Sequence, residues 1–220
     1  LNSGQAILGQ LLGEKTRTSL SQQDIIGAFK QALKIGTGEV VTQLSHKNGF
    51  NLDPKIHIPL PKNLATVQNT LGKVGLSFLL DDLETKINYA AEIATPHAKE
   101  LFFNAISQMT FDDVMNIYNG PQDSATRFFK SKMSSPLIQK MTPYVNNAVS
   151  QAGAVKAYDN VMAQYSTIPY VPDVKADLTN YVVAQGVEGI FYYLAKQEVQ
   201  IRQDPVRHTT DLLKKVFGNK

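Results

Sequence analysis

The segment that most limits how this chain can fold is Leu178–Gln203, "LTNYVVAQGVEGIFYYLAKQEVQIRQ". At about 100° per residue, one face of a helix over this segment is aliphatic and the nearly opposite face is aromatic or small. The first face carries Val183, Val187, Ile190, Leu194 and Ile201, and the second carries Tyr181, Ala184, Tyr192, Ala195 and Val199. A helix with apolar residues on both sides belongs in the middle of a helix bundle. Gly186 and Gly189 then predict points where a neighbouring helix approaches closely.

Helical periodicity also dominates the rest of the chain. A capping-box-like start at Ser21 and Asp24 predicts a long helix to about Leu44. Further helices are expected over residues 64–74, 76–94, 96–109, 110–120, 123–132, 136–151 and 154–165. We therefore predict an all-α fold, a compact bundle of about eight to ten helices. Residues 1–20 form an N-terminal segment for which a short helix is one interpretation, and residues 21–220 form a single all-α domain.

One stretch departs from the helical pattern. "NGFNLDPKIHIPLPKN", residues 48–63, begins with turn dipeptides and continues with alternating apolar residues and prolines. This composition predicts an extended, proline-rich connection that packs on the helical body.

Composition excludes several classes of function. The chain has no cysteine, which rules out disulfides and thiolate metal sites, and its net charge of +3 comes from charges of both signs that are interspersed. We therefore expect no nucleic-acid partner. No apolar run reaches the ~18 residues of a membrane span, so we expect no transmembrane segment in this chain.

Motifs for catalysis or metal binding are not evident. The four histidines, His46, His57, His97 and His208, show no ligand spacing along one helix, and Ser77 in "GLSFL" lacks the second glycine of a nucleophile elbow. We predict no catalytic residue, no metal and no cofactor.

Glu188 is the most informative polar residue, since it lies on the aromatic face of the predicted central helix. A buried carboxylate needs a partner or must become neutral. Arg202, Arg207, Lys99 or a tyrosine hydroxyl are candidate partners. Two interpretations stay open, a structural ion pair or hydrogen bond and a site carboxylate that faces a cavity.

A second polar row follows the predicted helix over 76–94, opposite its leucine seam. It consists of Asp81, Glu84, Asn88 and Glu92. Such a row is typical of a solvent-facing side of an amphipathic helix. The alternative is that Asn88 and Glu92 join Glu188, with Arg202 and Arg207, in one polar pocket.

The C-terminal segment "TTDLLKKVFG" predicts a short helix with Leu212, Leu213, Val216 and Phe217 on its apolar side. A helix of this length is unstable alone in water. We expect it to dock on the bundle; a partner protein or a membrane surface are the other possible docking surfaces.

Several motifs resemble those of the bacterial family DUF4197: "IHIPLP", "NYAAE" (88–92), "AISQMTFDDV", "YVVAQGVEGIFYYLAKQEVQIRQDP" and "TTDLLKKVFG". The resemblance covers the chain from about Ser21 onward. It implies a bacterial protein made with a signal peptide, often of lipoprotein type, and located in the periplasm or anchored to the envelope. A chain that begins with Leu1 fits removal of that signal segment. The resemblance implies no activity, cofactor or catalytic residue.

Together these features favour a non-enzymatic envelope protein whose helical bundle binds an apolar small molecule or another envelope protein. One alternative is a hydrolase that uses convergent carboxylates. A second alternative is a structural or assembly protein that acts through its surface.

Overall fold

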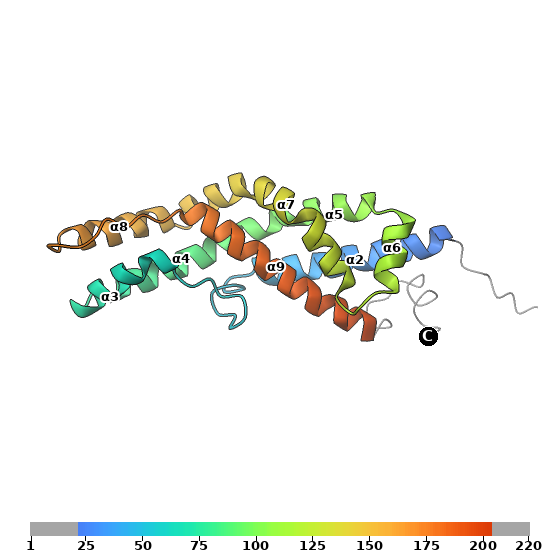
Figure 1. Ribbon diagram of the computed structural model, residues 1–220, viewed down its shortest axis with the longest axis horizontal. Helices are drawn as coiled ribbons and strands as arrows, with labels where there is room; N and C mark the ends of the chain where they lie inside the picture. Colours follow the sequence, from blue (N-terminus) through green and yellow to red (C-terminus); the bar gives the residue numbers. More distant parts are fainter. Residues whose placement is uncertain (1–21, 204–220) are drawn as a thin grey trace, which may run out of the picture.

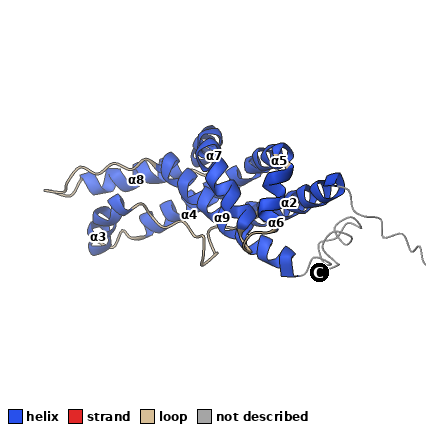
Figure 2. Cartoon of the chain, turned by 45° about the vertical axis from the view of Figure 1, so that its right-hand side comes forward, coloured by secondary structure: helices blue, strands red, loops and turns tan. Residues whose placement is uncertain are grey.

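Helices account for nearly all the regular structure in the computed structural model, which describes residues 22–203. In chain order they are α2 (Gln22–Ser45), η1 (Lys62–Leu64), α3 (Ala65–Lys73), α4 (Phe78–Ala94), η2 (Thr95–His97), α5 (Ala98–Gln108), α6 (Phe111–Tyr118), α7 (Ser124–Gln151), α8 (Ala154–Ser166) and α9 (Leu178–Gln203). Between residues 22 and 203 there is no strand (Figure 2). The predicted all-α fold is confirmed.

Helix α9 lies across the middle of the molecule (Figure 1). It crosses obliquely over the other helices (Figure 1) and packs against α7, α2 and α4. Its aliphatic face is buried, with Val183, Val187 and Ile190 at most 3% exposed. The opposite face is covered less completely than its composition predicts, since Tyr192 is 43% exposed.

The molecule is elongated, and its two ends are built from different helices. Helices α3 and α8 lie at one end, where α8 packs on both α4 and α3, while α6 and the first turns of α2 lie at the other end (Figure 1). None of the described helices combines the length and the apolarity needed to cross a lipid bilayer.

Helix α7 was predicted as two helices that separate near Pro136, and this prediction is wrong. The helix continues through both Pro136 and Pro143. An interior proline costs about 3 kcal/mol because it removes one N–H and crowds the carbonyl four residues earlier. Buried Met133 and Leu137 flank Pro136, and each such side chain contributes ~1.5–3 kcal/mol. The buried stripe therefore offsets the penalty at Pro136.

Gly189 allows the connection over residues 46–61 to press on α9. A Cβ atom added at Gly189 would lie 2.8 Å from a ring carbon of Phe50 and 3.3 Å from Cβ of Ile56. At Gly186 an added Cβ would be 3.9 Å from Cβ of Ala91 on α4, an ordinary contact. The close approach that the two glycines predict thus occurs at Gly189, and the neighbour is a loop and not a helix.

Candidate functional site

The carboxylate of Glu92 holds the start of the connection against α4. Glu92 is 3% exposed, and its oxygens accept hydrogen bonds from the backbone N–H groups of Asn48 (3.1 Å), Phe50 (3.1 Å) and Asn51 (3.2 Å). Three N–H donors compensate a buried negative charge without any cationic side chain. Glu92 therefore acts as a clamp on the turn that begins at Asn48.

Asn88, one helical turn earlier, binds the backbone of Ile58 in both directions. The N–H of Ile58 donates to Oδ1 of Asn88 (2.8 Å), and Nδ2 of Asn88 donates to the carbonyl of Ile58 (2.8 Å). Asn88 is completely buried. Its amide thus takes the place of a neighbouring strand for this extended segment.

Glu84 completes the row. It accepts hydrogen bonds from the N–H of Leu60 (3.1 Å) and lies 2.8 Å from Nε2 of His57, whose Nδ1 lies 2.8 Å from the carbonyl of Asn51. Both ring nitrogens of His57 therefore lie within hydrogen-bond distance of an oxygen atom, one from the backbone and one from Glu84. Asn88 and Glu92 are thus buried, Glu84 is half-buried, and all three hold residues 48–60 against α4, whereas Asp81, the first residue of the predicted row, is exposed.

Glu188 is not buried, and the sequence-based expectation on this point is wrong. Its side chain is 57% exposed and pairs with Lys130 of α7, with 2.6 Å between Oε2 and Nζ. The residues beside it on the aromatic face, such as Tyr192, are themselves partly exposed, so this face does not enclose a carboxylate. The structure therefore does not bring Glu188 together with buried Asn88 and Glu92.

The buried carboxylate of α9 is Glu198, and not Glu188 as the helical pattern predicted. Glu198 is 8% exposed and accepts hydrogen bonds from the N–H groups of Ala125 (2.8 Å) and Thr126 (2.9 Å) at the start of α7. A carboxylate at this position complements the positive end of the helix dipole. Glu198 follows Leu194 by one helical turn, and this spacing within the buried stripe is the pattern that could have identified it.

Arg202 belongs to the same cluster. Its guanidinium pairs with Glu198 (3.0 Å) and donates to the carbonyl of Ile117 at the end of α6 (2.7 Å). Arg202 therefore ties α9 to α6, while Glu198 ties α9 to α7. Arg207 and the predicted docking residues Leu212, Leu213, Val216 and Phe217 lie outside the described residues.

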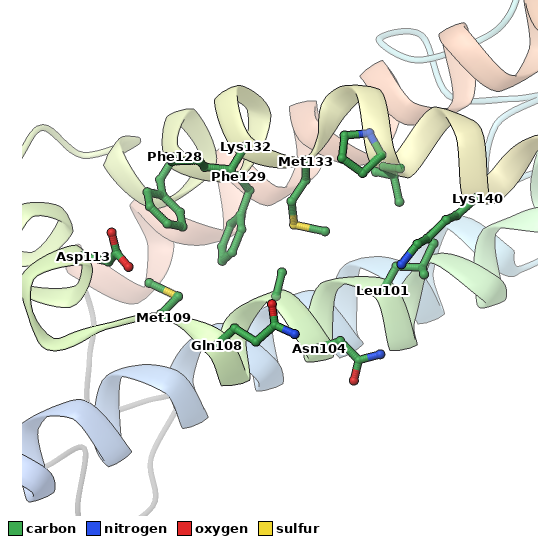
Figure 3. Close-up of a pocket in the computed structure, with 13 residues that line it drawn as sticks. Leu101, Asn104, Gln108, Met109, Asp113, Phe128, Phe129, Lys132, Met133 and Lys140 are labelled. Atoms are coloured by element: carbon green, nitrogen blue, oxygen red, sulfur yellow. The ribbon is translucent and has the colours of Figure 1, made fainter.

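The feature best suited to hold a small molecule is a cleft of about 390 Å³ between α5 and α7 (Figure 3). We call it the α5–α7 cleft. It is lined by Leu101, Asn104, Ala105, Gln108, Met109, Asp113, Phe128, Phe129, Lys132, Met133, Pro136, Leu137 and Lys140.

The helical period explains why these residues meet. The α5 wall consists of Leu101, Asn104, Ala105 and Gln108, which lie at steps of three and four residues on one face. The α7 wall repeats the same steps from Phe128 to Lys140. Small Ala105 faces the larger residues of α7 and leaves room between the helices.

The floor of the cleft is apolar and held in place by aromatic packing. Phe129, 3% exposed, meets Phe102 edge to face at 6.0 Å between ring centroids and Phe128 at 5.6 Å. Met109 and Met133, at 5% and 9% exposure, add flexible thioether side chains.

Charged groups stand at the two ends of the cleft. Asp113 caps α6, and hydrogen bonds from the N–H (2.9 Å) and hydroxyl (2.8 Å) of Thr110 hold the pKa of its carboxyl below its usual range. Lys140 stands at the opposite end (Figure 3). Its side chain makes no ion pair or hydrogen bond with any residue of the described part of the chain.

Two other hollows are larger and have more polar residues in their walls. One of about 680 Å³ over α2 and α5 and one of about 620 Å³ beside the turn at Asn48 are lined mainly by polar and charged side chains. Within residues 22–203, no group of three or more His, Cys, Asp or Glu side chains is placed to hold a metal ion. The α5–α7 cleft differs from the other two in its aromatic and thioether floor.

Comparison with known protein families identifies a relationship that covers nearly the whole chain. The model of a family described as "Protein of unknown function (DUF4197)" matches residues 19–218. No curated protein and no solved structure matches the chain.

Proposed function

The chain belongs to the DUF4197 family, whose description assigns no activity, and we propose from the geometry that it is a non-enzymatic protein that binds an apolar small molecule in the α5–α7 cleft. The observation that carries this proposal is the apolar floor of Phe129, Met109 and Met133 beneath a cleft of about 390 Å³. Small-molecule sites typically occupy ~300–1,000 Å³ and are lined mostly by apolar and aromatic side chains.

The floor is preorganised for binding. Edge-to-face contacts fix Phe129 against Phe102 and Phe128, so its ring need not be ordered when a ligand arrives. Methionine side chains are flexible and adapt to ligands of different shape. They therefore favour a site that accepts various apolar groups over a site that is specific for one ligand shape.

The polar groups of the cleft favour binding over catalysis. Those that line it are Asn104, Gln108, Asp113, Lys132 and Lys140, and they include no Ser, Cys or His nucleophile. Asp113 is engaged with Thr110 as a helix cap. Paired-carboxylate hydrolysis, the alternative from the sequence, lacks its pair, because Glu188 is bound to Lys130 at the surface and Glu92 is bound by backbone N–H groups.

The envelope location is the second part of the proposal, and the motif resemblance supports it. Fractionation of bacterial cells that express the full-length gene tests it. Recovery with the periplasmic or membrane-anchored fraction is expected, and recovery with the cytoplasm would contradict the proposed location without affecting the cleft.

Occupancy of the cleft can be tested with N-phenyl-1-naphthylamine, a neutral apolar probe that fluoresces on leaving water. We expect saturable binding to the wild-type protein. Ala105→Trp should fill the cleft and weaken probe binding at least about tenfold, since the indole takes the space of the probe.

Ala163→Trp is the matched control, because Ala163 is an exposed residue of α8 that does not line the cleft. It should bind the probe as the wild type does. Equal probe binding by wild type and Ala105→Trp would contradict the cleft as the binding site.

A further inference from the structure

We infer that the occupant of the α5–α7 cleft is a free single-chain amphiphile with an anionic head group, such as a fatty acid, whose head lies at Lys140 and whose chain lies on the Phe129 floor. This inference rests on the proposed function and adds the chemical class and the orientation of the ligand.

The ends of the cleft differ in charge, and this difference sets the orientation. Asp113 is anionic, since two hydrogen bonds from Thr110 favour its charged form. Lys132 lies close enough to Asp113 to affect its carboxyl electrostatically, so that part of the Lys132 charge is compensated. An anionic head is therefore repelled from the Asp113 end.

Lys140 is the uncompensated cation. In Figure 3 its ammonium group lies toward the α5 wall near Leu101, at the end of the cleft remote from Asp113. No acidic side chain of residues 22–203 pairs with it. A carboxylate, sulfate or phosphate head would supply the missing partner.

The space between these ends suits one chain. From Phe128 to Lys140 the axis of α7 advances about 18 Å, at ~1.5 Å per residue. Along this length the α7 wall presents Phe128, Phe129, Met133 and Leu137. A volume of about 390 Å³ lies near the lower limit for small-molecule sites, which favours a single chain over a two-chain lipid.

Neutral hydrogen-bonding groups stand along the route. Asn104 and Gln108 on α5 offer amide donors, and Pro136 provides no N–H to the carbonyl of Lys132 four residues earlier. Because these groups are neutral, they do not discriminate between charged and uncharged ligands. Discrimination by charge is therefore expected to come from Lys140.

The test compares three amphiphiles of equal chain length: dodecanoate, 1-dodecanol and dodecyltrimethylammonium. Direct calorimetric titration below the micellar concentration should give about fivefold tighter binding of dodecanoate than of the other two. A ratio of this size is expected for an ion pair that stays accessible to water, and it should shrink as salt is added.

Lys140→Gln should remove the preference for dodecanoate while N-phenyl-1-naphthylamine still binds. Lys140→Glu should reverse it in favour of dodecyltrimethylammonium. Lys156→Gln, at an exposed lysine of α8 outside the cleft, is the matched control and should keep the wild-type preference.

The outcomes separate the two proposals. Equal affinity for the three amphiphiles, or an unchanged preference in Lys140→Gln, would overturn the anionic ligand and leave the apolar site intact. Binding of neither dodecanoate nor the neutral probe would overturn both. Cosedimentation with phosphatidylglycerol vesicles that persists in Ala105→Trp would assign the anion preference to a bilayer surface and overturn the inference.

Discussion

Glu198, near the end of α9, accepts hydrogen bonds from both the backbone N–H (2.9 Å) and the hydroxyl (3.0 Å) of Thr126, 72 positions earlier in the first turn of α7. A capping side chain usually comes from the residue just before its helix, yet Asp123 makes no side-chain capping bond here. The longest helix of the described region is thus capped by the central helix, and Arg202 extends the link to α6. Packing of α9 against α7 and formation of the first turn of α7 are therefore coupled.

Glu198→Ala should lower the free energy of unfolding by about 2–4 kcal/mol. The substitution leaves the N–H groups of Ala125 and Thr126 without their acceptor and Arg202 without its carboxylate partner. Urea denaturation followed by circular dichroism measures the change.

Glu188→Ala is the matched control, a loss of the same carboxylate on the same helix. Its ion pair with Lys130 is about half exposed on both sides, so the change should stay within about 0.5 kcal/mol. Equal destabilisation by the two variants would refute the capping role of Glu198.

Gly189→Ala should destabilise the protein by about 1–3 kcal/mol. Its new methyl group would meet the Phe50 ring at 2.8 Å and force the connection away from α9. Thermal unfolding measures the melting temperature of this variant, which is compared with that of Gly186→Ala.

At Gly186 the nearest atom to an added Cβ is 3.9 Å away, and alanine is the better helix former by about 1 kcal/mol. Gly186→Ala should therefore be neutral or stabilising. A lower melting temperature for Gly186→Ala than for Gly189→Ala would show that the loop does not press on α9 as described.

Asn88→Asp should loosen the connection over residues 48–60. The variant keeps an acceptor for the Ile58 N–H but loses the two Nδ2 donations to the carbonyls of Ile58 and Glu84, and it places a carboxylate against them. We expect a loss of about 2–3 kcal/mol in stability, measured by urea denaturation, and faster proteolytic cleavage within residues 51–60.

Asn160→Asp on the exposed side of α8 provides the control, because Asn160 makes no side-chain hydrogen bond with the described residues. Asn160→Asp should change neither the free energy of unfolding nor the rate of proteolytic cleavage measurably. Wild-type cleavage rates in Asn88→Asp would contradict the anchoring role of the amide.

Much of the fold follows from local patterns. The apolar spacing in α2, α4 and α9 predicted their positions within one or two residues, and the helix predicted over residues 110–120 corresponds to α6. Such signals are local because a helix determines the relative positions of its own side chains.

The polar contacts were harder to predict because their partners are distant in the chain. A helical wheel places Glu188 and Glu198 on α9 but does not say which neighbour covers each face. Glu92 and Asn88 bind backbone groups 30 to 44 positions away, and backbone N–H groups leave no mark in the amino-acid pattern. Prediction of the α5–α7 cleft would have required knowing that α5 and α7 are neighbours, which the local pattern of neither helix indicates.

Tyr193→Phe should remove an alkaline dependence of stability. The hydroxyl of Tyr193 donates to the carboxylate of Asp53, and this hydrogen bond, with burial, raises the pKa of Tyr193 to about 12. Burial raises the pKa of Asp53, but hydrogen bonds from Tyr193, Lys55 and Ile56 outweigh it and lower that pKa. The bond thus requires a protonated phenol and an ionised carboxyl.

The sign of the effect follows from these shifts. A tyrosine whose pKa is raised on folding contributes stability that is complete below its unfolded pKa of ~10 and is lost as the pH rises toward 12. The difference in unfolding free energy between wild type and Tyr193→Phe should therefore be constant from about pH 6 to 9 and shrink above pH 10. Asp53, whose pKa is lowered, should make the same difference shrink in acid as the pH falls below ~4. Urea denaturation of both proteins across this range measures it, and a difference that stays flat to pH 12 would show that Tyr193 and Asp53 are not coupled.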